Sequence, residues 1–200
     1  MDLNGDGMDD LITGEYTPGD VYWFEGAKTG FNAPVKIPEQ GVDPQNMDRW
    51  MSTARFVDWD GDGDLDLLVG SVKGGVFLNL NVGDKAAFRF GERKPVMADS
   101  GPMRVKQKSH PVPVDWDGDG VLDVLVGDEW AGASFFKGRP DRTFENGVPL
   151  TGDGKPLVPG YRVRLEVADW NSDGKLDLLV GNCEQVNGRT TGNVYVFLRQ

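Results

Sequence analysis

The fold of this chain is decided by Asp58-Trp59-Asp60-Gly61-Asp62-Gly63-Asp64-Leu65-Asp66, which runs directly into Leu67-Leu68-Val69-Gly70. Carboxylates at the first, third, fifth and ninth positions place four hard oxygen donors around one point, and the two glycines permit the tight backbone that this needs. The seventh residue would add its backbone carbonyl, as in other loops of this carboxylate spacing. The stretch therefore predicts a calcium-binding loop.

The same pattern occurs four times, beginning at residues 2, 58, 115 and 169, and every copy keeps oxygen-bearing side chains at positions 1, 3, 5 and 9. The predicted metal ligands are Asp2, Asn4, Asp6, Met8 and Asp10 in loop 1; Asp58, Asp60, Asp62, Asp64 and Asp66 in loop 2; Asp115, Asp117, Asp119, Val121 and Asp123 in loop 3; and Asp169, Asn171, Asp173, Lys175 and Asp177 in loop 4. The seventh residue of each loop would contribute only its carbonyl. This period indicates one repeat domain with approximate units 1–53, 54–109, 110–163 and 164–200, the first and last incomplete.

The net charge is −11, and four Ca²⁺ ions would bring it to −3 because they carry eight positive charges. This acidity favours metal and argues against a nucleic-acid partner, which selects basic surfaces. The single cysteine, Cys183, offers neither a disulfide framework nor a zinc cluster, and we expect an unpaired thiol in a loop.

No apolar run approaches the roughly 18 residues of a membrane span, so no direct membrane insertion is expected. Met1 adjoins the first predicted ligand, so we expect no secretory signal within this segment. Weak calcium loops are nevertheless useful mainly where calcium is plentiful, outside the cytosol. We therefore expect part of a larger exported chain that is extracellular, periplasmic or at the cell surface.

Short apolar runs predict four strands per repeat. A strand follows each loop (11–14, 67–70, 124–127, 178–181), then an aromatic strand (21–24, 76–79, 133–136, 194–197), then a weaker one (31–37, 88–90, 143–145), and finally a strand that enters the next loop (54–57, 111–114, 165–168). This arrangement predicts an all-β fold, a β-propeller or a four-repeat part of one, with calcium loops between the first and second strands of four-stranded antiparallel blades. An EF-hand is excluded because position 12 holds Thr or Val rather than Glu.

The motif Asp-x-Asp/Asn-x-Asp-Gly-x-x-Asp followed by Leu-Leu-Val-Gly resembles the FG-GAP or VCBS-type repeats of integrin alpha-subunit propellers and of many bacterial exported proteins. The resemblance covers essentially the whole chain. It implies calcium coordination by side chains 1, 3, 5 and 9 and by carbonyl 7 in all four loops. The Phe-Gly signature survives clearly only at Phe90-Gly91, so no specific integrin-like partner is implied.

In an up-and-down blade the turns alternate between two ends, so the turns between the second and third strands and the connections between blades lie opposite the calcium loops. These opposite segments differ among the repeats and include the insert 182–192. Surfaces that discriminate ligands vary in this way. The predicted ligand-contacting residues are Tyr16, Arg49, Trp50, Arg104, Glu129 and Trp130.

Other interpretations apply to several of these residues. Trp59, Trp116 and Trp170 recur at loop position 2, which favours packing. Trp50 and Trp130 do not recur, and they could stack on a glycan or anchor their loops. Residues 104, 106 and 108 are basic and alternate, which favours a solvated edge strand. The only histidine, His110, is predicted to be structural or to line a channel.

No catalytic constellation is visible, because the single His and single Cys lie in different repeats. We expect an exported, calcium-stabilised binding module for a glycan or protein. A propeller domain of a secreted polysaccharide lyase or hydrolase and a purely structural spacer remain open alternatives. Loops 2 and 3, with four carboxylates each, should bind Ca²⁺ most tightly, and loop 1 least tightly because it lies at a terminus.

Overall fold

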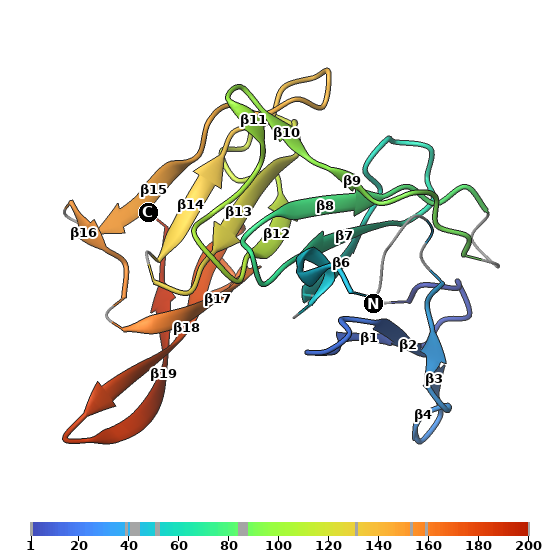
Figure 1. Ribbon diagram of the computed structural model, residues 1–200, viewed down its shortest axis with the longest axis horizontal. Coiled ribbons are helices and arrows are strands. Elements are labelled where there is room, and N and C mark those ends of the chain that lie inside the picture. Colours follow the sequence, from blue (N-terminus) through green and yellow to red (C-terminus); the bar gives the residue numbers. More distant parts are fainter. Residues whose placement is uncertain are drawn as a thin grey trace.

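The computed structural model describes residues 2–38, 40, 45–50, 53–83, 88–130, 132–152, 154–158 and 160–199. Its main elements are four antiparallel sheets that follow one another along the chain (Figure 1). Sheet 1 has the order β1 (Leu11–Gly14), β2 (Val21–Phe24), β5 (Val35–Lys36); sheet 2 has β6 (Thr53–Val57), β7 (Asp66–Gly70), β8 (Val76–Asn79), β9 (Lys94–Pro95). Sheet 3 has β12 (His110–Val114), β13 (Asp123–Gly127), β14 (Ala133–Phe136), β15 (Val148–Gly152), β16 (Lys155–Pro156); sheet 4 has β17 (Tyr161–Ala168), β18 (Asp177–Val186), β19 (Arg189–Phe197).

Smaller elements lie in the connections. They are the hairpins β3 (Gly26–Ala27) with β4 (Gly30–Phe31) and β10 (Met97–Ala98) with β11 (Gly101–Pro102), and the 3₁₀ turn η1 (Met47–Arg49). In the part of the chain that the structure describes, no helix is long and apolar enough to cross a membrane.

The strand after each acidic loop and the strands that enter loops 2, 3 and 4 were predicted correctly, but two of the weaker strands were not. Residues 88–90 and 143–145 form isolated bridges rather than strands: Phe90 pairs with Asn81, and Phe144 pairs with Gly138 and Ala98. Both phenylalanine rings are buried between sheets. The strands that pair with β8 and β14 come later in the chain, as β9 and β15. Burial of the aromatic ring, rather than strand pairing, explains the apolar signal at these positions.

The insert 182–192 is not an irregular loop. It continues the ladder of β18 and β19 into a long hairpin, which projects from the rest of the chain in Figure 1. Its tip is Asn187-Gly188, with φ of 51° and 74°, the left-handed pair that a tight two-residue hairpin requires. Cys183 is a free thiol within β18 and does not lie in a loop.

Three apolar clusters fill the spaces between successive sheets. The residue at loop position 2 belongs to the cluster shared with the following sheet: Leu3 and Trp59 are each 6% exposed, and Trp116 is half-buried. Trp170 is 61% exposed, so the packing prediction is wrong there. The described residues contain no sheet after sheet 4, and this indole therefore has no neighbouring sheet to pack on.

The first strands of sheets 2, 3 and 4 lie close together, and β12 contacts both β6 and β17. Arg55 of β6 forms an ion pair with Glu166 of β17 at 2.7 Å. His110 is buried beside them and its Nδ1 accepts the Leu165 amide at 3.4 Å. Burial, assisted by Arg55 and Arg164, lowers the pKa of His110 to about 3. His110 is therefore a neutral, buried group.

Acidification should destabilise the fold through His110. The unfolded chain gains a proton below about pH 6.5 that the folded chain does not accept, so stability is fully present above that pH and is lost as the pH falls toward 3. The expected loss between pH 6.5 and 5 is about 2 kcal/mol. Urea unfolding in EDTA at pH 7 and pH 5 measures it, and His110→Gln should show a smaller loss. Equal losses in both proteins would contradict this assignment.

Candidate metal centres

Each acidic loop is folded by its own carboxylates. Loop 2 connects β6 to β7, and its first residue, Asp58, accepts the Gly61 and Gly63 amides at 2.8 and 3.1 Å. Asp115 and Asp2 accept the equivalent amides in loops 3 and 1. Gly61 and Gly63 have φ of 79° and 88°, a left-handed backbone that favours glycine. Hydrogen bonds from the loop's own amides to its first carboxylate thus shape loops 1, 2 and 3.

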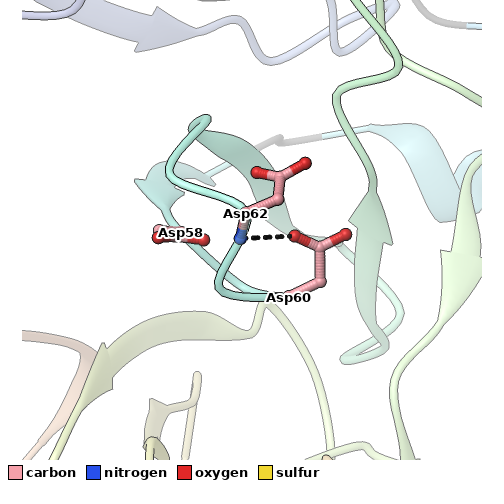
Figure 2. A group of neighbouring side chains, drawn as sticks. All are labelled: Asp58, Asp60 and Asp62. Carbon is pink, nitrogen blue, oxygen red and sulfur yellow. Dashed lines mark hydrogen bonds between the residues drawn. The ribbon is translucent and has the colours of Figure 1, made fainter.

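The carboxylates of the two richest loops converge. One oxygen from each of Asp58, Asp60 and Asp62 lies within 4.8 Å of the others, and Figure 2 shows these side chains around the loop with the Asp62 amide bonded to Asp60. Loop 3 brings together Asp115, Asp117 and Asp123 in the same way. Oxygens that share one Ca²⁺ at about 2.3–2.6 Å lie no more than about 5 Å apart. The donor set and its spacing therefore fit a calcium ion.

The ninth residue of each loop forms buried or partly buried hydrogen bonds that the sequence did not reveal. Asp66 is 1% exposed; its Oδ2 accepts the Trp59 amide at 2.9 Å and its Oδ1 accepts the Asn81 amide at 2.7 Å. The corresponding two bonds recur at Asp10, Asp123 and Asp177. Burial raises the pKa of Asp66 and of Asp123, an effect that the backbone amides partly offset. This carboxylate therefore holds the loop, as a clamp, to the chain just after the aromatic strand of the same sheet, which is β2, β8, β14 or β19.

Loop 4 departs from the others at its fourth position. Ser172 stands where the other loops have glycine and adopts a φ of 61°. Asp169 still accepts the Asp173 and Gly174 amides at 2.9 Å each, so the loop keeps its shape. The left-handed conformation is less favourable for serine than for glycine.

The predicted ligand-contacting residues lie at the opposite end of the sheets, where turns and connections meet. The Val72 amide donates to the Trp50 carbonyl and the Glu129 amide to the Gln107 carbonyl. Tyr16 and Trp130 are 63% and 60% exposed. Trp130 lies 6.0 Å from the Tyr161 ring.

Other predicted contact residues are engaged within the protein. Arg49 is buried and forms an ion pair with Asp20. Glu129 is 4% exposed and pairs with Lys108 at 2.7 Å. The indole of Trp50 is half-buried.

Arg104 remains exposed and donates to the Lys73 carbonyl at 3.1 Å. The segment around it is irregular, so the predicted edge strand over residues 104–108 is wrong. Its backbone instead bonds to the neighbouring turns: the Val105 amide donates to Gly74 and the Lys108 amide to Val72. With Lys106 and Asp128, Arg104 lines a hollow of about 470 Å³.

A comparison with known protein families identifies the repeat that contains the acidic loops. The model of the FG-GAP-like repeat matches three overlapping ranges, 2–69, 58–126 and 115–180, each of which begins at an acidic loop and ends in the strand after the next one. A search of curated proteins finds no match. The three ranges together cover most of the chain and all four acidic loops. The chain therefore belongs to the FG-GAP-like repeat family.

Proposed function

We propose that the chain is a calcium-stabilised, propeller-like binding module that recognises a glycan or a protein through the end opposite its acidic loops. The observation that carries the proposal is the division of chemistry between the two ends. One end repeats an oxygen-rich loop with little variation, and the other carries exposed aromatic and basic groups that differ from repeat to repeat. A metal-stabilised scaffold that presents variable loops is suited to recognition.

The acidic loops would hold up to four Ca²⁺ ions. The side chains at positions 1, 3 and 5 would bind each ion, with the seventh carbonyl and a lone pair of the ninth carboxylate completing the set. Bound calcium would neutralise carboxylates that otherwise repel one another at short range. Because such weak sites fill mainly where calcium is abundant, we also propose an extracellular, periplasmic or cell-surface location.

Trp130 is the anchor that we assign to the ligand. Large aromatic side chains dominate binding energy when a partner covers them, contributing about 2 kcal/mol or more at a hot spot. The neighbouring Tyr161 ring, with Arg162 5.7 Å from its centre, extends this surface. Arg104 beside the hollow supplies a donor for polar or anionic groups.

The test is a glycan array followed by titration of the best ligand. Trp130→Ala should weaken binding roughly thirtyfold, the equivalent of about 2 kcal/mol, and leave the calcium-dependent melting unchanged. Asp117→Ala should have the opposite effects. Trp170 provides a matched control, since it is exposed to the same extent but lies in an acidic loop.

Loss of binding in a folded Asp117→Ala protein, or in Trp170→Ala but not in Trp130→Ala, would contradict the assignment of the two ends. Turnover of a polysaccharide panel would indicate the enzyme instead.

A further inference from the structure

One position next to the acidic loops differs in charge from repeat to repeat. The residues directly after β2, β8, β14 and β19 are Glu25, Leu80, Lys137 and Leu198. Each precedes the residue whose amide binds the ninth carboxylate of the loop, namely Gly26, Asn81, Gly138 or Arg199. The shared clamp therefore holds all four positions beside their loops, although the side chains are an acid, a base and two leucines.

In repeat 3 this position delivers a cation to the loop. Lys137 Nζ lies 2.7 Å from Asp119 Oδ2 and also contacts Asp117 Oδ2. Asp117 and Asp119 are the third and fifth residues of loop 3, which are predicted metal ligands. These contacts raise the pKa of Lys137 and lower that of Asp119. The ammonium thus lies against carboxylate oxygens that a calcium ion would use.

In repeat 1 the same position has the opposite charge. Glu25 Oε1 accepts the side-chain amide of Asn4 at 2.9 Å, and its Oε2 accepts that of Asn32 at 2.7 Å. Asn4 is the third residue of loop 1, so Glu25 adds a carboxylate where the loop itself lacks one. Leu80 and Leu198 are exposed and bring no charge to loops 2 and 4.

We propose that Lys137 is a tethered counter-cation of loop 3 that competes with Ca²⁺, and that this position sets how strongly each loop depends on metal. The inference rests on the proposed calcium binding. A bound ion must displace the ammonium from two carboxylates. Loop 2 has equally many carboxylates at its side-chain ligand positions, and among the described residues no lysine or arginine forms an ion pair with them, although Arg142 lies beside Gly61. Loop 3 therefore binds calcium less tightly than loop 2 and is more ordered without it. This revises the ranking that carboxylate number alone predicts.

Reciprocal exchange of the residues of repeats 2 and 3 tests the inference. Lys137→Leu should lower the calcium concentration that half-protects residues 115–123 from amide hydrogen exchange, by roughly threefold to tenfold for two partly exposed ion pairs. In EDTA the same segment should exchange faster than in the wild type. Leu80→Lys should raise the half-protecting concentration for residues 58–66 and slow their exchange in EDTA.

Lys155→Leu is the matched control for net charge. It removes the same charge from an exposed residue of β16. Lys155 pairs with Gly152, which lies beyond the Ala133 end of β14, whereas Lys137 follows the Phe136 end. It should leave loop 3 unchanged.

If Lys137→Leu changes neither the calcium midpoint nor the EDTA exchange of loop 3 while loop 2 still responds to calcium, the counter-cation role is wrong and calcium binding stands. If no loop of the wild-type chain responds to calcium, calcium binding itself is wrong.

Discussion

Removal of calcium with excess EDTA should lower the melting temperature of this chain by roughly 10 °C or more. A ligand that binds only the folded state at a hundred times its dissociation constant contributes about 2.7 kcal/mol per site. For a domain of this size, about 1 kcal/mol shifts the melting temperature by roughly 2–4 °C. Two saturated loops would suffice for the expected change. The measurement is thermal unfolding by circular dichroism, with metal content determined before and after chelation.

The physical reason lies in the clustered carboxylates of loop 2. Three of their oxygens lie within 4.8 Å of one another, and the loop presents no cation of its own to them among the described contacts. Without metal, no ion pair among the described residues offsets this charge, although the Arg142 guanidinium lies beside Gly61. Added calcium should restore the melting temperature, and high sodium chloride should recover part of it by screening. An unchanged melting curve after verified metal removal would refute calcium stabilisation.

The sequence predicted the parts of this structure that depend on local chemistry. The loops and the strands on either side of them follow from the spacing of Asp and Gly and from short apolar runs that end in glycine. Their geometry is set by bonds within a few residues, such as Asp58 to Gly61 and Gly63. A repeated local pattern therefore identified the family and the pairing of the strand after each loop with its neighbours, such as β7 with β6 and β8.

Features that depend on distant residues were not predicted. Trp170 has the same motif position as Trp59, but Trp59 is buried against the following sheet, whereas the described residues place no such sheet beside Trp170. Lys137 reaches Asp117 across 20 residues of sequence, and its counterpart in repeat 2 is a leucine. Pairing of Arg49 with Asp20 likewise removes a predicted contact residue from the surface. The hairpin turn at Asn187-Gly188, in contrast, could have been predicted, because Asn-Gly is a local signal for a two-residue turn. This signal was missed.

Replacing the ninth residue of loop 2 should destabilise the fold whether or not calcium is present. Asp66→Ala leaves the buried Trp59 and Asn81 amides without their acceptor, at a cost of about 1–3 kcal/mol each. Burial raises the pKa of Asp66, so relief of its desolvation offsets part of this cost. We expect a net loss of about 2–4 kcal/mol in excess EDTA, measured by urea unfolding.

Asp60→Ala separates this clamp from metal binding. Asp60 is exposed, and among the described residues its carboxylate accepts a single long bond, of 3.3 Å from the Asp62 amide. Two other loops already carry Asn at this third position. In EDTA its loss should cost little stability, because it also removes repulsion within the cluster; in calcium it should abolish the stabilisation contributed by loop 2. If Asp66→Ala matched Asp60→Ala in EDTA, the ninth carboxylate would be a metal ligand alone. A loss in EDTA confined to Asp66→Ala would establish that this buried side chain holds the loop to the sheet before any ion binds.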